Sequence, residues 1–203
     1  MPFISIEGID GSGKTEQVKL LVQRLRNSGR TVLQTKEPDG GQLGKKVRAI
    51  LTCPNHQLSP TEQLLLVSAA RFDHVRSVIR PALANGQWVV SDRFIDSTYA
   101  FQVAVSELDL HQLFRSTRDI VVGPTSPDRT IILDLPLEVA RARRASRSDA
   151  TLDPAEATRD FCAIREGFIA SAREDSGRCR IVDANQTPSQ VAHDIWRIVE
   201  PLL

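Results

Sequence analysis

Residues 3–15 read FISIEGIDGSGKT and combine two structural signals. The first five residues form a short apolar run with β-branched side chains, which predicts a strand that is buried on both faces. Residues 8–15 match the pattern G-x-x-x-x-G-K-[S/T] at every fixed position. In this pattern, glycines let successive backbone N–H groups turn inward around a phosphate, and the following helix adds positive potential at its start. The stretch therefore predicts a strand, a phosphate-binding loop and a helix over residues 15–27.

The side chains of this loop have separate expected tasks. Lys14 should reach the β- and γ-phosphates of a nucleotide, and Thr15 should hold Mg²⁺ through its hydroxyl. ATP would be bound by the backbone and side chains of the whole loop. The predicted loop contacts are Gly8, Asp10, Gly11, Ser12, Gly13, Lys14 and Thr15.

Further along the chain, short apolar runs alternate with helical patterns. Residues 31–35, 87–91, 130–135 and 179–182 are the other predicted strands. A capping box at Ser59, with Pro60 at the first helical position, predicts a long helix that runs toward Asn85 and Gly86, and Thr187 begins the last helix in the same way. Alternating strands and helices predict an α/β fold with a five-stranded parallel sheet covered on both faces. Neither repeats nor a long linker divide residues 1–203, which predicts a single domain.

Charge and composition narrow the function classes. Hydrophobic residues make up 41% of the chain and charged residues 25%, which excludes a disordered chain. The 26 basic and 25 acidic residues give a net charge of +1, whereas a protein that grips nucleic acid through its phosphates is normally far more basic. No apolar run approaches the roughly 20 residues that span a bilayer, and the start of the chain lacks a targeting pattern. We therefore expect a cytoplasmic protein with neither nucleic acid nor membrane as a partner. The widely spaced Cys53, Cys162 and Cys179 fit reduced thiols.

A second polar segment follows the third predicted strand. Asp92 and Arg93 stand at its carboxyl end, where ligands of parallel α/β sheets bind. An aspartate there can organise Mg²⁺, and an adjacent arginine can hold a phosphate through a bidentate fork. The chain lacks the N-K-x-D pattern expected of a GTPase. These features favour a small-molecule kinase.

Six segments together resemble bacterial thymidylate kinase: residues 3–15, 36–44, 69–71, 81–86, 91–102 and 183–186. The stretches FISIEGIDGSGKT, EPDGGQLG and DRFIDSTYAFQ are similar to signature stretches of that family and occur in the same order. The resemblance implies the P-loop NTPase three-layer fold with a small lid. It also implies transfer of the γ-phosphoryl group of ATP to dTMP, giving dTDP and ADP, with Mg²⁺ as cofactor and a homodimer as the assembly.

The resemblance also assigns roles around the acceptor nucleotide. Arg93 and Arg71 would bind the phosphate and base sides of dTMP, with Arg48 as a helper. Asp10 would contact the deoxyribose 3′-hydroxyl, and Asp92 would serve the Mg²⁺ site together with Thr15. The full expected acceptor set is Asp10, Glu37, Arg48, Val67, Arg71, Arg93, Thr98, Phe101 and Gln102. On the donor side, Asn185 resembles the loop residue beside adenine.

Four arginines in residues 141–147 resemble the start of the family's lid, which we expect at about residues 141–155. Because residue 11 is glycine, that position of the phosphate-binding loop carries no cation, and the resemblance implies that the lid supplies the catalytic cation instead. The resemblance implies catalytic roles for Arg143 and Arg147, beside Lys14 and Arg93, and an ATP contact for Arg144.

The chain departs from the family pattern at four places. Val67 replaces a phenylalanine that stacks on thymine, which would weaken base binding by roughly 1–3 kcal/mol. Residues 39–41 read DGG instead of GGT, and residues 103–106 read VAVS where the family has a Gly-rich stretch that contains arginine. Residues 148–153 lack the lid's D-R-x-E. Two alternatives therefore stay open: a kinase for dUMP or a 5-substituted dUMP, and a nucleotide-binding regulatory module without turnover. The intact Lys14, Thr15, Asp92 and Arg93 argue against the second.

Overall fold

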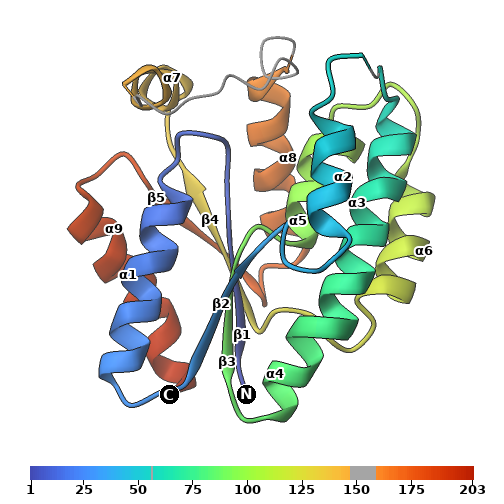
Figure 1. The fold of residues 1–203 in the computed structure, drawn as a ribbon. Helices are drawn as coiled ribbons and strands as arrows, with labels where there is room; N and C mark the ends of the chain where they lie inside the picture. The colour runs from blue at the N-terminus through green and yellow to red at the C-terminus, as the bar shows by residue number, and fades with distance from the viewer. Residues whose placement is uncertain (56, 147–158) are drawn as a thin grey trace.

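A computed structural model describes residues 1–55, 57–146 and 159–203. Its centre is one parallel sheet with the strand order β2-β3-β1-β4-β5 (Figure 1). The strands are β1 (Phe3–Glu7), β2 (Val32–Lys36), β3 (Trp88–Asp92), β4 (Arg129–Asp134) and β5 (Cys179–Asp183). All five predicted strands are present, and their ends agree with the prediction within one residue.

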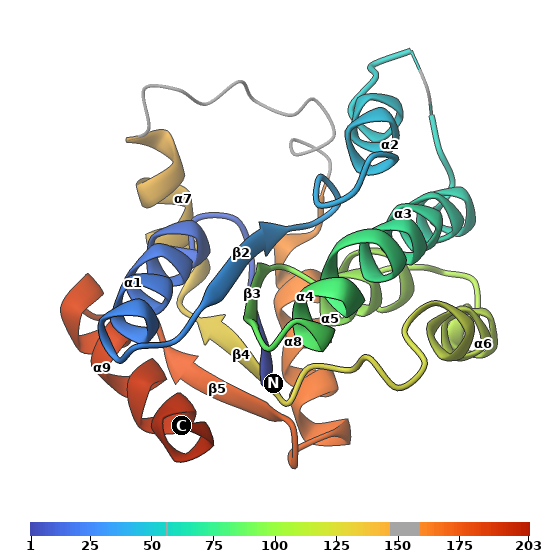
Figure 2. The same cartoon turned by 60° about the horizontal axis from the view of Figure 1, so that its bottom comes forward.

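Helices cover both faces of this sheet (Figures 1 and 2). Helices α1 and α9 lie together against one face, and α4, α5 and α8 lie on the other side, with α2, α3 and α6 further out. The helices are α1 (Lys14–Asn27), α2 (Gly44–Leu51), α3 (Pro60–His74), α4 (Arg80–Ala84), α5 (Ile95–Thr98), α6 (His111–Val121), α7 (Leu137–Ala145), α8 (Phe161–Glu174) and α9 (Pro188–Val199). The three-layer α/β fold is therefore confirmed.

The strands read as continuous apolar runs because both of their faces are buried. Along β3, Trp88 and Val90 join the core cluster that includes Leu21 of α1 and Ile195 of α9. Val89, which points to the opposite face, joins a second cluster on the α4 side. Burying one such side chain contributes about 1.5–3 kcal/mol, so the sheet is held from both sides.

The capping boxes begin their helices where the sequence predicts. The Ser59 side chain accepts a hydrogen bond from the Glu62 backbone N–H, and Glu62 accepts one from the Ser59 N–H at 2.8 Å. The long helix that follows is not uniform, because a π-helical segment (Val75–Ile79) separates α3 from α4. Pro81 offers a reason: it has no N–H to donate, and its ring would collide with the carbonyl one turn earlier in a regular α-helix.

Parallel strands bring the loops after β1, β2 and β3 to one edge of the sheet, at the top of Figure 1. The phosphate-binding loop, the turn at residues 37–44 and the residues after Asp92 meet there. None of the described helices has the length and apolar character needed to cross a membrane. The three cysteines are free thiols, as predicted.

Candidate active site

The phosphate-binding loop (residues 8–15, the P-loop) forms a polar cradle at the start of α1. Gly8, Gly11 and Gly13 have φ values of 135°, 91° and 92°, which a residue with a side chain adopts only under strain. The Ser12 hydroxyl is buried and has no hydrogen-bond partner within the described residues. The first N–H groups of a helix also lack intrahelical partners. The loop thus offers unpaired donors to an anion.

Lys14 lies inside this cradle. Its ammonium donates hydrogen bonds to the carbonyl oxygens of Gly8 at 3.0 Å and Ile9 at 2.9 Å, and it is 3.7 Å from the Asp10 carboxylate. Burial and the neighbouring charge of Arg93 lower the pKa of Lys14 to about 8. A bound phosphate would favour the charged form of this amine.

Gly11 faces the backbone of α7. A Cβ atom at this position would lie 2.4 Å from the carbonyl oxygen of Ala140, closer than real contacts allow. The structure therefore gives a steric reason, besides the positive φ, for the absence of a side chain at residue 11.

Thr15 and Asp92 meet at the carboxyl end of β3. The Thr15 hydroxyl donates a hydrogen bond of 2.8 Å to Asp92 Oδ2. Within residues 1–55, 57–146 and 159–203, no cluster of three or more metal-binding side chains is present. Two adjacent oxygen donors fit Mg²⁺, which commonly takes one or two protein ligands and completes its shell with water and phosphate oxygens.

Arg93 extends from the end of β3 to the P-loop. Its guanidinium bonds Asp10 at 2.5 Å, the Gly8 carbonyl at 3.1 Å and the Ser97 hydroxyl at 3.0 Å. Although burial alone would raise it, the positive charges of Arg93, Lys14 and Arg159 hold the pKa of the Asp10 carboxyl well below its usual range. Asp10 is therefore ionised at neutral pH.

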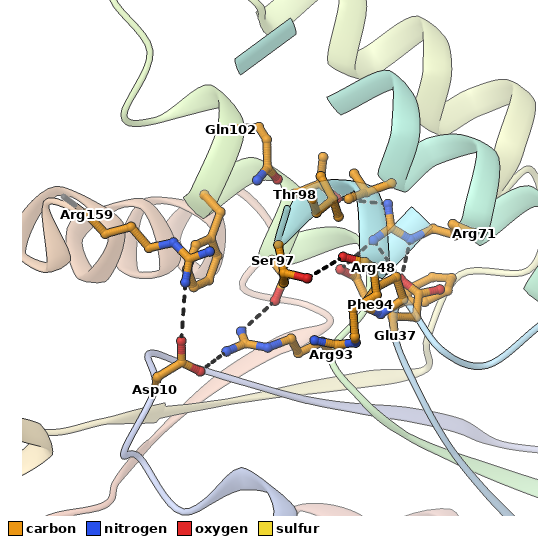
Figure 3. A pocket seen from close by; sticks show the side chains of 15 residues that line it. Asp10, Glu37, Arg48, Arg71, Arg93, Phe94, Ser97, Thr98, Gln102 and Arg159 are labelled. Carbon is orange, nitrogen blue, oxygen red and sulfur yellow. Dashed lines mark hydrogen bonds and ion pairs between the residues drawn. The ribbon is translucent and has the colours of Figure 1, made fainter. Parts of the chain in front are cut away.

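Arg159 is a cation of the site that the sequence analysis missed. Its guanidinium is 3.9 Å from Asp10 and lies over the Phe101 ring, 5.5 Å from the ring centre. Arg93 also contacts this ring, at 5.0 Å. Figure 3 shows the Arg159 and Arg93 side chains converging on Asp10 from different directions.

Beside the P-loop, a cavity of about 280 Å³ opens (Figure 3). All nine residues that the sequence analysis assigned to an acceptor line it. The other lining residues are Pro38, Leu51, Thr52, Phe94, Ser97 and Arg159. The structure thus brings the predicted acceptor set together around one space, although the segments come from five parts of the chain.

One wall of the cavity is a buried ionic network around Arg71. This side chain is 3% exposed and donates to Glu37 at 2.7 Å, to the Thr98 hydroxyl at 2.9 Å and to the Phe94 carbonyl at 3.0 Å. His74 contacts the other Glu37 oxygen at 3.1 Å. Because several partners fix it, Arg71 presents a rigid polar surface to a ligand.

The sequence departure at residue 39 has a structural role. Asp39 accepts a hydrogen bond from Arg48 at 2.7 Å and pairs with Lys36 at 3.0 Å. Although partial burial opposes the shift, these two cations lower the pKa of Asp39. Asp39 therefore fixes Arg48 at the rim of the cavity.

The departure after Gln102 also has a packing role. A second π-helical segment (Tyr99–Val103) continues α5, and Val103 is buried with Leu64 and Leu110. The segment after Gln102 is thus anchored by an apolar contact with α3 and with the residue before α6.

Val67 lines the cavity, and three nearby phenylalanines could in principle replace the missing stacking ring. Phe94 is fully buried, with the Arg71 guanidinium 5.3 Å from its ring centre, and Phe101 contacts two arginines. Phe72 is 43% exposed and lines a groove on the outer side of α3. Phe72 is therefore excluded as a replacement stacking partner.

Arg143 and Arg144, which the sequence analysis assigned to a lid, lie outside the lining of the cavity. Arg143 donates to the Gln186 carbonyl at 3.4 Å, next to the exposed Asn185 in the turn after β5. Arg144 lies over the Phe161 ring, 4.3 Å from its centre. Arg147 and the departure at 148–153 fall outside the described residues.

Comparison with known proteins gives one family. The family model described as thymidylate kinase matches residues 6–195. The chain is 38% identical to the thymidylate kinase of Alcanivorax borkumensis, covering 98% of this chain and 96% of that protein. It is 42% identical to that of a Synechococcus strain, with 99% and 95% covered. A crystal structure of thymidylate kinase from Ehrlichia chaffeensis superimposes with a TM-score of 0.76 at 30% identity, covering 98% of both chains.

Proposed function

The chain belongs to the thymidylate kinase family, and we propose that its P-loop binds the phosphates of ATP while the adjoining cavity binds dTMP. The protein is an ATP-dependent nucleoside-monophosphate kinase that converts dTMP to dTDP and releases ADP. The convergence of Lys14, Arg93 and Arg159 where loop and cavity meet is the observation that carries the assignment of the two sites.

Phosphoryl transfer needs two anionic substrates held in line and their developing charge neutralised. Lys14, Arg93 and Arg159 bring three cationic side chains to the junction of loop and cavity, where phosphate groups can contact them. The attacking phosphate oxygen of dTMP is already deprotonated, so no general base is required. The protein's contribution is positioning and charge.

We propose Mg²⁺ as the cofactor, held by Thr15 and Asp92. When bound, the ion would neutralise charge on the ATP phosphates. The adjacent oxygen donors of these two residues are the support for this assignment.

For the base, we propose recognition by Arg71 and Thr98. The Thr98 hydroxyl accepts a hydrogen bond from Arg71, so its own proton is left to donate to a carbonyl oxygen. Thymine presents such oxygens on its Watson–Crick edge, whereas cytosine has an amino group in place of one of them. Glu37, Val67, Phe101 and Gln102 would complete the pocket around the sugar and base, and Arg48 would assist from the rim.

On the donor side, Asn185 would lie beside adenine, and Arg144 would contact ATP. Arg143 and Arg147 would bring positive charge from the lid, which we place at about residues 141–155 of a single domain spanning 1–203. The contact of Arg143 with the 183–186 turn supports the placement of that arginine near the nucleotide donor.

We also propose that two copies pair through the outer face of α3 and α6. Leu65 and Phe72 on α3 and Ile120 on α6 are 48%, 43% and 72% exposed, and these two helices pack side by side. Large apolar side chains gathered on one face suit a two-fold interface, in which the same patch serves both copies. Ile120→Glu should give a monomer in analytical ultracentrifugation. An unchanged sedimentation coefficient would place the interface elsewhere.

The need for ATP points to the cytoplasm as the compartment.

The function is tested by ADP release with each nucleoside monophosphate as acceptor. We expect dTMP to give the highest kcat/KM, and Lys14→Ala to abolish turnover without unfolding the protein. Preference for dUMP or a 5-substituted dUMP would change the acceptor assignment. Turnover in a folded Lys14→Ala variant would overturn the role of the P-loop.

A further inference from the structure

Glu7 is a buried carboxylate at the carboxyl end of β1, next to the P-loop. The side chain has no solvent exposure, and a buried charge is tolerated only where hydrogen bonds or opposite charges stabilise it. Its hydrogen bonds all go to residues 94–97, which follow β3. This carboxylate therefore ties the turn after Arg93 to the strand that carries the P-loop.

The contacts match those of a helix cap. Glu7 Oε1 accepts hydrogen bonds from the Phe94 N–H at 2.7 Å and from the Ser97 N–H at 3.4 Å, and Oε2 accepts one from the Ser97 hydroxyl at 2.6 Å. Phe94 is the N-cap residue of α5, and its side chain has no acceptor to offer. Glu7 supplies that acceptor from a neighbouring strand.

Arg93 depends on this turn in two ways. Its backbone has a φ of 72°, a left-handed conformation that is unfavourable for a residue with a side chain and persists only where the surroundings hold it. Its guanidinium donates to the Ser97 hydroxyl at 3.0 Å, and that hydroxyl in turn donates to Glu7. Glu7 is thus linked to both the backbone and the side chain of the arginine.

We propose that Glu7 is a positioning residue of the kinase, which holds Arg93 in the geometry needed to bind the acceptor phosphate. The proposal rests on the proposed function, in which Arg93 contacts dTMP. Glu7 itself touches neither substrate. Its effect on the reaction passes through Ser97 and the 93–97 turn.

The charged groups around Glu7 are consistent with this role. Arg93 and Lys14 are the nearby cations, and Asp96 on α5 is a nearby anion. Burial and Asp96 raise the pKa of Glu7 to about 7, against the hydrogen bond from Ser97 and the charge of Arg93. An amide oxygen can accept the same backbone hydrogen bonds, so Glu7→Gln should keep the cap.

The test compares Glu7→Leu, Glu7→Gln and Ser97→Ala with the wild type in steady-state kinetics. We expect Glu7→Leu to raise the KM for dTMP about tenfold or more and the KM for ATP less than twofold, and Glu7→Gln to recover most of the difference. Ser97→Ala, which removes the link but keeps the Glu7 carboxylate and its backbone hydrogen bonds, should change the dTMP KM in the same direction. Ser5→Ala, a control on the same strand, removes the buried contact with Thr130 and should leave both KM values unchanged.

A double-mutant cycle separates positioning from general destabilisation. In an Arg93→Ala background, Glu7→Leu should add little further loss, because its effect passes through Arg93. Full additivity, or a folded Glu7→Leu enzyme with wild-type KM values, would overturn the proposal. If Glu7→Leu does not fold, an unchanged dTMP KM in Ser97→Ala would overturn it. The wild-type acceptor panel tests the function separately, so a failure of either conclusion can be recognised.

Discussion

The Asp10 carboxylate lies among three cations that come from distant parts of the chain. Arg93 is 2.5 Å away, Lys14 3.7 Å and Arg159 3.9 Å. Arg93 and Lys14 follow strands, whereas Arg159 precedes α8. A phosphate group at this point would meet all three cations, so the removal of any one of them should impair the reaction.

Arg159 should act on the acceptor side. Arg159→Ala is expected to lower kcat by about 10- to 100-fold and to raise the KM for dTMP, because preorganised positive charge is lost from the cavity. Arg143→Ala is the matched variant on the donor side and should lower kcat without changing the dTMP KM. Steady-state kinetics with each substrate varied will show this. A dTMP KM that rises in Arg143→Ala and not in Arg159→Ala would reverse the assignment.

Val67 should set the width of the base pocket. Phe94 and Phe101 also line the cavity but are held by contacts with arginines, so we expect a phenylalanine at residue 67 to find room beside the base. Val67→Phe should therefore tighten dTMP binding by about 1–3 kcal/mol and exclude bulkier 5-substituents. Calorimetry with dTMP and 5-substituted dUMP measures both effects. Weaker dTMP binding would mean an overpacked pocket, and no change would mean that Val67 lies away from the base.

At this scale, the sequence was informative where a motif fixes the position of a side chain. Lys14 and Thr15 follow from the P-loop pattern, and Asp92 from its place at a strand end. Arg159 belongs to no motif, and its position depends on how the chain returns to the site before α8. Glu7 did carry a signal, because a carboxylate that ends an otherwise apolar strand needs buried partners.

Helix α3 contributes both to the stability of the protein and to the lining of the cavity. Its capping box begins the helix at Pro60, and the same helix carries Val67 and Arg71 into the cavity. The strands and capped helices were predictable because apolar periodicity and capping residues are local signals. The π-helical segments were not predicted. Pro81 indicates an irregularity near the first one without specifying its form, and the second, Tyr99–Val103, contains neither proline nor glycine to indicate it.

Ser59→Ala should lower the free energy of unfolding by about 1 kcal/mol, because the Glu62 N–H loses its acceptor. Thr187→Ala removes the corresponding cap of α9 and should have an effect of similar size. Urea denaturation of both variants gives the comparison. A Ser59→Ala variant as stable as the wild type would show that the cap contributes nothing.

The protein as a whole is nearly neutral, but several of its cationic side chains lie close together in one region. The net charge is +1, yet Lys14, Arg71 and Arg93 are largely buried within one region. Behind the site, Arg178 pairs with the buried Asp96 at 2.7 Å, which joins α5 to the start of β5. The resemblance predicted the fold, but it predicted this charge distribution only in outline. The ion pairs join segments that are far apart in the sequence, and only the folded sheet brings them together.

Glu7 should make the stability of the whole protein depend on pH. Burial and Asp96 raise its pKa from 4.5 to about 7, so between these pH values the folded protein binds more protons than the unfolded chain. The contribution of Glu7 to the free energy of unfolding must therefore fall as pH rises from 4.5 to 7. Denaturation of the wild type and Glu7→Gln from pH 5 to 8 checks this. The wild type should lose stability relative to the variant as pH rises, and parallel profiles would contradict the expectation.

The close approach of Gly11 to Ala140 has an evolutionary consequence. The backbone of α7 occupies the space that a side chain at residue 11 would need, so a lineage with this geometry cannot gain a loop arginine by one substitution. The helix would have to move first, and moving it would displace Arg143 from the 183–186 turn. In the proposed function, a change from a lid cation to a loop cation would therefore pass through a variant that has lost the Arg143 contact. Descendants of this chain should keep a small residue at position 11 for as long as α7 stays where it is.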